Sequence, residues 1–160
     1  MHQRRSIRLP EYDYSSPGAY FVTIVTHDRN YLLGRVVNDV PVLSEYGKIA
    51  EKVWVGLPSH YPHVELGAFC IMPNHVHGIV IIRDVEEGKR QPLTEVIRGF
   101  KSFSARWINQ LRKTTGQPVW QRSFYEHVIR NEADYQAIHN YILANPMNWN
   151  QDELRDKTSA

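Results

Sequence analysis

The chain has 160 residues, of which 42% are hydrophobic, and its formal net charge is +2. This composition can build a hydrophobic core and excludes a disordered chain, and the length favours one domain over residues 1–160. The single cysteine excludes an internal disulfide and a cysteine-built zinc site, and it suits a reducing cytoplasm. A polar start and a longest apolar run of only residues 78–82 predict neither a signal peptide nor a membrane span, so we expect a cytoplasmic protein.

Strand-like and helical patterns of hydrophobic residues follow one another along the chain. Ser44 and Asn131 stand where helix N-caps are expected, and Pro58 and Pro146 end the first and last predicted helices. In chain order, the predicted elements are a basic extended arm (1–17), strands at 19–26 and 31–37, a helix at 44–57, strands at 64–72 and 75–83, a helix at 92–113, one or two short strands within 118–130, a helix at 131–145 and a polar tail (147–160).

Two neighbouring strand pairs, 19–26 with 31–37 and 64–72 with 75–83, have connections too short for a helical crossover. We therefore expect each pair to form an antiparallel hairpin. Together with the helices, these hairpins predict an α+β fold. Its form should be a ferredoxin-like sandwich, an antiparallel sheet with helices packed mainly on one face.

Two histidines head an otherwise apolar strand in the segment Met72-Pro73-Asn74-His75-Val76-His77-Gly78. Residues two apart on a strand point to the same face, so His75 and His77 present two imidazoles side by side. Such a pair is a good start for a metal site. A chance pair, with one ring half-buried and one solvated, is about equally common for an arbitrary His-x-His sequence.

Three other classes of enzyme or metal site use neighbouring histidines, and the residues or spacing found here exclude each of them. Histidine-triad hydrolases need a third histidine where Ile79 stands, and cupin sites need a glutamate that residues 78–83 lack. Zincins space their two histidines by a helical turn around a glutamate, which is not the spacing found here.

A tyrosine and an amide share one face of the last predicted helix. Tyr141 and Asn145 are four residues apart, so the phenol and the amide lie along one line. A packing tyrosine and a helix-stopping asparagine would give the same spacing. Combined with the histidine pair, however, they supply two nitrogen ligands, one oxygen ligand and a nucleophile.

Basic residues gather on the long predicted helix and near its flanks. Arg98, Lys101 and Arg112 lie opposite its apolar stripe, and Arg106 and Lys113 flank them. A solvated face is the commoner fate of such charges, but this helix has no acidic residue after Glu95, which favours a surface that binds phosphates. The residues predicted to contact phosphate are Arg4, Arg5, Arg8, Arg98, Lys101, Arg106, Arg112 and Arg122.

Five segments in a fixed order carry the pattern of a known family. They are residues 5–8 with 12–14 and 18–23, the motif at 72–77, Phe100-Lys101, residues 119–122 with 124–130, and Tyr141-Ile142 with Asn145-Pro146. In these segments the chain resembles the single-tyrosine HUH transposases, most closely their REP-associated tyrosine transposase branch.

The resemblance implies a transposase-type endonuclease that cuts and rejoins hairpin-forming single-stranded DNA, at repeat or element ends, through a 5′-phosphotyrosine intermediate. Tyr141 would be the nucleophile, and His75, His77 and Asn145 would hold a divalent metal, Mg²⁺ or Mn²⁺. Better-studied relatives carry glutamine four residues after the tyrosine, and Asn145 offers the same amide oxygen on a shorter stem. Both a monomer and a homodimer agree with the family.

Two other functions agree with the same sequence. A domesticated descendant would process DNA repeats without moving them. A non-catalytic ferredoxin-like module would bind nucleic acid by stacking bases on aromatic residues of its sheet, such as Tyr20, Phe21 and Phe69. A metal site would distinguish the enzyme from this module, which has no use for His75 beside His77.

Overall fold

A computed structural model describes residues 18–83 and 91–155, so the predicted arm with Arg4, Arg5 and Arg8 lies outside the described residues. The strands are β1 (Gly18–Val25), β2 (Gly34–Val37), β3 (Val40–Leu43), β4 (Val64–Met72), β5 (His75–Ile82) and β6 (Tyr125–Ile129). The helices are α1 (Glu45–Val55), α2 (Leu57–His60), α3 (Leu93–Leu111) and α4 (Glu132–Ala144), and the 3-10 turns are η1 (His27–Arg29), η2 (Trp149–Gln151) and η3 (Glu153–Arg155).

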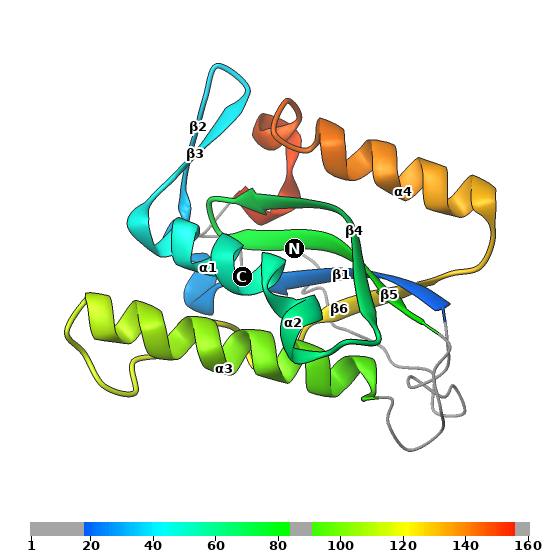
Figure 1. Cartoon of the computed structure of the whole chain (residues 1–160). Coiled ribbons are helices and arrows are strands. Elements are labelled where there is room, and N and C mark those ends of the chain that lie inside the picture. The colour runs from blue at the N-terminus through cyan, green and yellow to red at the C-terminus, as the bar shows by residue number, and fades with distance from the viewer. Residues whose placement is uncertain (1–17, 84–90, 156–160) are drawn as a thin grey trace.

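Four of these strands form one sheet in the order β4-β5-β1-β6, and every neighbouring pair is antiparallel. Helix α1 comes between β1 and β4, and α3 between β5 and β6, as Figure 1 shows. With β2 and β3 set apart, this is the β-α-β-β-α-β order of the ferredoxin-like fold. The predicted α+β fold with an antiparallel sheet is therefore confirmed.

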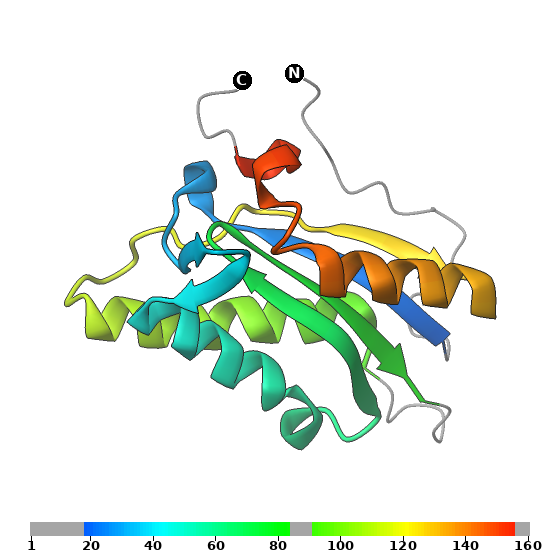
Figure 2. The same ribbon diagram turned by 90° about the horizontal axis from the view of Figure 1, so that it is seen from above.

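The sheet has helices on both faces. The helices α1 and α3 cover one face, as predicted, whereas α4 lies across the other (Figure 2). Because neighbouring residues of a strand point to opposite faces, Tyr20, Val22 and Ile24 of β1 enter the main core under α1 and α3. The residues between them, which include Phe21 and Thr23, face α4.

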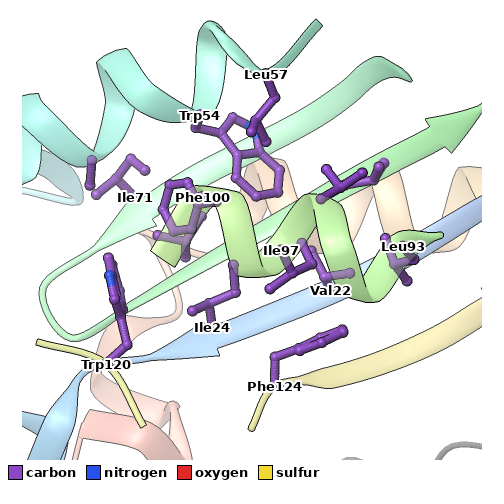
Figure 3. Packing of buried hydrophobic residues seen from close by; sticks show 14 of the residues in the cluster. Val22, Ile24, Trp54, Leu57, Ile71, Leu93, Ile97, Phe100, Trp120 and Phe124 are labelled. Carbon is purple, nitrogen blue, oxygen red and sulfur yellow. The ribbon is translucent and has the colours of Figure 1, made fainter. Parts of the chain in front are cut away.

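The main core is closed by large aromatic side chains (Figure 3). Trp54 of α1 is fully buried and meets Phe100 of α3 edge to face, with ring centroids 5.4 Å apart. Trp54 also covers Gly78 of β5, where an added Cβ would lie only 2.3 Å from the indole ring. The glycine therefore makes room for the tryptophan that joins the helical layer to the sheet.

The predicted pairing of strands 19–26 and 31–37 is wrong, whereas the hairpin of β4 and β5 is confirmed. Both edges of β1 are occupied, by β5 and by β6, so no edge is left for β2. Instead β2 pairs with β3 in a separate ribbon. Its turn residues, Asn38 and Asp39, have φ values of 50° and 64°, which suit a tight hairpin turn.

The predicted caps are confirmed for both helices. The Ser44 hydroxyl accepts a hydrogen bond of 3.0 Å from the Gly47 N–H at the start of α1. The Asn131 side chain accepts one of 2.8 Å from the Asp134 N–H at the start of α4. Pro58 ends α1 less sharply than expected, because it lies in the first turn of the short helix α2.

The segment after α4 differs from the predicted polar tail. Residues 149–155 form the turns η2 and η3, and they bury Trp149 and Leu154. These two apolar side chains hold the segment against the sheet, beside the start of β5. In the part of the chain that the structure describes, no helix has the length and hydropathy to cross a bilayer.

The contact between Trp54 and Gly78 generates a stability prediction. We expect Gly78→Val to lower the free energy of unfolding by about 1–3 kcal/mol, the usual cost of forcing extra methyl groups into a packed core. Urea unfolding followed by tryptophan fluorescence measures it. In a double-mutant cycle with Trp54→Leu, the smaller side chain should recover part of the loss. Strictly additive losses would contradict this contact as the cause.

Candidate functional site

His75 and His77 lie side by side on the face of β5 that α4 covers. Their ring centroids are 4.4 Å apart, and both side chains are buried. Their partners on β1 are Val25 and Thr23. The apolar residue between them, Val76, points into the main core on the other face. The alternation predicted from the sequence is therefore present in the structure.

Asn74 fixes the orientation and the protonation of the His75 ring. The Asn74 Nδ2 group donates to the backbone carbonyls of Arg29, at 3.3 Å, and of Leu154. The Asn74 oxygen therefore faces His75 Nδ1, 2.8 Å away. An amide oxygen only accepts, so His75 carries its proton on Nδ1. Its Nε2 atom then presents the lone pair that a metal ligand requires.

A hydroxyl group from the neighbouring strand orients the second ring. Thr23 Oγ1 of β1 lies 2.9 Å from His77 Nδ1, and both groups are buried. Thr23 is also the Cα partner of His77 in the β1–β5 register. The sheet itself thus supplies the outer-shell partner of this histidine.

Asp152 joins the two histidines and was missed from the sequence. Its Oδ2 atom lies 3.5 Å from His75 Nε2, while its Oδ1 atom accepts a hydrogen bond of 2.8 Å from the Leu154 N–H. It sits between η2 and η3, in the segment predicted as a polar tail. The spacing Trp149-x-x-Asp152-x-Leu154 was the available signal, since two apolar residues enclose the acid.

Asn145 reaches the same cluster from the end of α4. Its side chain is buried, and its Nδ2 group lies 3.4 Å from Asp152 Oδ2. Among the described residues, its Oδ1 atom has no hydrogen-bond partner. A buried oxygen without a partner is costly unless something binds it. The structure thus brings Asn145 to the predicted place beside the histidines, and its role as a ligand stays a prediction.

The donor set fits a divalent cation. One ligand atom from each of His75, His77 and Asp152 lies within 4.8 Å of the other two. Ligands at right angles around one ion, each about 2.1 Å from it, are roughly 3 Å apart, so small side-chain shifts suffice. The carboxylate and amide oxygens suit hard ions such as Mg²⁺ and Mn²⁺, whereas the two imidazoles favour ions such as Fe²⁺ and Zn²⁺.

Cys70 is a neighbour of the cluster that does not fit the donor set. It is the Cα partner of His77 across β4 and β5. Burial raises the pKa of its thiol to about 11, so the group is protonated at neutral pH. A protonated thiol is a poor nucleophile, and among the described residues the ligand atoms that cluster together come from His75, His77 and Asp152 and not from Cys70.

Tyr141 stands next to the histidine pair on α4. Its ring centroid is 5.5 Å from that of His77 and 6.1 Å from that of Phe21, which it meets edge to face. Unlike the histidines it is 46% exposed, so a large substrate can reach it. The structure therefore brings the predicted nucleophile and the predicted ligands together.

Two other tyrosines lie on the same face of the sheet but differ in their surroundings. The hydroxyl group of Tyr135 lies over Gly67 of β4, 2.9 Å from where a Cβ of Gly67 would be, and its ring stacks on His139. Tyr125, on β6, is the Cα partner of Thr23. No ring contact with His75 or His77 is found for either tyrosine among the described residues.

The cations of α3 are not brought to this cluster. They lie with α3 on the opposite face of the sheet (Figure 2). Lys101 Nζ donates to the carbonyls of Gln121, Arg122 and Ser123 at 2.8, 3.1 and 3.0 Å. Arg112 is held by Asn109 and the carbonyls of residues 117 and 118. Arg106 lies over the ring of Phe103.

Family comparison bears on most of the chain. A family model described as "Transposase IS200 like" matches residues 42–145. An uncharacterized protein of Haemophilus influenzae is 36% identical over 171 residues, which cover 96% of this chain and 94% of that protein. A REP-associated tyrosine transposase of Escherichia coli is 30% identical over 87 residues, which cover 52% of this chain and 44% of that protein.

A solved structure shares the fold. It is a REP-associated tyrosine transposase bound to a REP hairpin, and it is similar with a TM-score of 0.64 and 20% sequence identity. The likeness covers 96% of this chain and 76% of that chain. The arrangement of an antiparallel sheet with packed helices is therefore one that a transposase uses.

The cluster of His75, His77 and Asp152 generates a metal-binding prediction. We expect calorimetry to detect one Mn²⁺ site in the wild type and none in the His75→Ala, His77→Ala double variant. Asp152→Asn should weaken binding about tenfold or more, since the anionic ligand is lost; tenfold corresponds to 1.4 kcal/mol. Asn145→Ala should also weaken it, because its amide oxygen would leave the metal shell.

His63 offers the matched control, since it is buried but bonded to residue 91, away from the cluster. His63→Ala should bind Mn²⁺ like the wild type. Equal Mn²⁺ binding by the wild type and the double variant would contradict a metal site at His75 and His77. An unchanged Mn²⁺ affinity in Asn145→Ala would show that Asn145 is not a metal ligand and only ends α4.

The hydrogen bond from His75 to Asn74 generates a second prediction. Asn74→Ala should lower Mn²⁺ affinity by about 10–100-fold, the usual effect of removing an outer-shell partner. Nitrogen-15 NMR of the imidazole should show that His75 loses its single tautomer. Asn74→Asp keeps an acceptor for Nδ1 and should keep the tautomer, but it should lower stability because the donors to the carbonyls of Arg29 and Leu154 are lost. A single tautomer in Asn74→Ala would show that Asn74 does not set it.

Proposed function

The chain belongs to the IS200-like transposase family, and on that premise we propose that it is a metal-dependent enzyme that cuts and rejoins single-stranded DNA with Tyr141. The observation that carries the proposal is the position of Tyr141. Its exposed phenol lies beside His77, one member of a buried group that could hold a metal. The proposed nucleophile and the residues that could hold an electrophilic metal thus lie next to each other.

His75, His77 and Asp152, with Asn145 beside them, are the residues that would hold the metal. When bound there, a divalent ion would supply positive charge that polarises the phosphoryl oxygens of the scissile phosphate. Asn74 and Thr23 would keep the two imidazoles in position. The shared face of β5 therefore serves to fix the phosphate, and α4 serves to present the nucleophile.

In the proposed reaction, the Tyr141 oxygen attacks phosphorus. A bond from this oxygen to phosphorus forms, and the bond from phosphorus to the 3′-oxygen breaks. The phenol loses its proton, and the leaving 3′-oxygen gains one, so the products are a 5′-phosphotyrosine and a free 3′-hydroxyl. A free phenol has a pKa of about 10, so it needs help to react at neutral pH.

The reverse reaction would rejoin DNA without another energy source. The phosphotyrosine diester keeps the bond energy of the original phosphodiester. A 3′-hydroxyl can therefore attack it and release Tyr141. This agrees with the sequence, which lacks a Gly-rich phosphate loop.

The proposed substrate is single-stranded DNA that folds into hairpins. A similar solved structure is a transposase bound to a REP hairpin, which supports a hairpin partner for this chain. Mg²⁺ and Mn²⁺ are the proposed cofactors. The rival function is a non-catalytic nucleic-acid module, and the buried cluster of histidine and aspartate argues against it, because pure base stacking needs no such group.

The proposed role of Tyr141 generates a test by covalent capture. We expect Tyr141→Phe to bind hairpin DNA near the wild-type affinity, because the ring is kept. It should form no covalent adduct in Mn²⁺, because the attacking oxygen is gone. Denaturing electrophoresis of the protein with labelled DNA measures the adduct.

Tyr125→Phe and Tyr135→Phe are the matched controls, since each removes one hydroxyl from the same face of the sheet. Both should still form the adduct. An adduct in Tyr141→Phe, or peptide mapping of the DNA to another tyrosine, would overturn the assignment. Normal binding without an adduct in the wild type would favour the non-catalytic module.

A further inference from the structure

A cationic groove lies on the other side of the sheet from Tyr141. It has a volume of about 470 Å³ and runs between the first half of α3 and the segment that leads into β6. Its lining combines cations with hydroxyl groups above an apolar floor. The lining residues are Thr94, Ile97, Arg98, Lys101, Ser102, Arg122, Ser123 and Phe124.

Lys101 organises this groove. Its three hydrogen bonds to successive carbonyls hold residues 121–123 against α3. An ammonium group has three donors, so these carbonyls can use all of them. Lys101 also lies 6.0 Å from the ring centroid of Phe124, which is buried in the core below. The segment that carries Arg122 is therefore fixed in advance.

The two arginines are the groups available to a ligand. Arg98 and Arg122 are both exposed. Arg98 lies 3.5 Å from Glu95, but this pair is on the surface, with 77% and 45% of the side chains exposed. Such a pair contributes little stability, so a phosphate can replace it. For Arg122, the described residues offer no carboxylate within salt-bridge distance.

The chemistry of the groove suits a phosphodiester. Guanidinium groups bind phosphate oxygens through paired hydrogen bonds, and the hydroxyls of Ser102 and Ser123 add donors. None of the groove-lining residues is acidic. The groove thus offers two exposed cations and several hydroxyls to a polyanion.

The position of the groove links it to the proposed active site. Phe124 lines the groove, and the next residue, Tyr125, begins β6 and is the Cα partner of Thr23. Thr23 in turn contacts His77. Since β6 is the edge strand of the sheet, one edge strand separates the groove from the face that carries Tyr141. A flexible single strand can pass around that edge.

We propose that the groove between α3 and residues 122–124 binds the phosphodiester backbone of the DNA strand that leads to Tyr141, through Arg98 and Arg122. This inference rests on the proposed function and deepens it. It divides the cations predicted from the sequence into two groups. Arg98 and Arg122 contact phosphate, whereas Lys101 holds the loop.

The test compares DNA binding by the wild type and an Arg98→Gln, Arg122→Gln double variant. The probe is a fluorescent DNA hairpin with single-stranded flanks, followed by anisotropy over a range of salt concentrations. The double variant should bind about tenfold more weakly, and its log–log salt slope should be shallower by about 1.4, which is 0.7 for each lost phosphate contact on a single strand. Arg35→Gln, an exposed arginine on β2, should change neither value.

Two further probes, the hairpin without flanks and the flank alone, identify the part of the DNA that the groove contacts. We expect the difference between the two proteins to appear with the single-stranded flank; a difference that appears only with the hairpin stem would contradict a groove that binds the strand leading to Tyr141. If the double variant has the wild-type affinity and salt slope on all three probes, the groove does not bind the DNA backbone.

The covalent adduct separates this proposal from the proposed function. At DNA concentrations below the Kd of the wild type, the double variant should form the adduct about tenfold more slowly, in step with its weaker binding. If the wild type forms no adduct but the double variant loses affinity, the proposed reaction of Tyr141 is rejected and the proposed DNA-binding groove is retained. If the adduct forms and the affinity is unchanged, only the groove fails.

Discussion

The antiparallel register between β1 and β5 is the constraint that organises the candidate site. It pairs Thr23 with His77 and Val25 with His75. A slip of one residue would reverse the faces, because side chains alternate along a strand. His75 and His77 would then enter the main core, and Val76 would face α4. The packing of Trp54 on Gly78 resists this slip, since a larger residue at that position would clash with the indole ring.

The residues around this register also supply a hydrogen-bond partner to the Nδ1 atom of each buried imidazole. Buried imidazoles are stable only when their polar atoms have partners. Thr23 comes from the neighbouring strand, and Asn74 from the turn that starts β5. Asn74 is held in turn by the carbonyl of Arg29, whose φ of 53° is unusual for a residue other than glycine. Backbone of this kind is common near functional sites.

Local patterns in the sequence predicted much of the fold and most of the site. The alternation of side chains along β5 predicted that His75 and His77 share a face. The spacing of four residues on α4 predicted that Tyr141 and Asn145 lie on one face of that helix. These inferences succeed because each depends on a single element. The family resemblance, which the comparisons confirm, joined those elements into one site.

Features that depend on distant contacts could not be predicted in this way. The expected pairing of β1 with β2 failed because β6, more than a hundred residues later, occupies the free edge of β1. Asp152 was missed because its place depends on how Trp149 and Leu154 pack against the sheet. On α3, charge alone did not reveal that Lys101 and Arg112 bond to backbone carbonyls.

The docking of Asp152 beside His75 has a consequence for the newly made protein. The proposed metal ligands come from β5 and from a segment 75 residues after His77. At about 5–20 residues per second, a ribosome needs roughly 4–15 s to translate that interval. Until Asp152 has left the ribosome, the two histidines lack the carboxylate that completes their cluster. A nascent chain would therefore lack the complete set of proposed metal ligands throughout this interval.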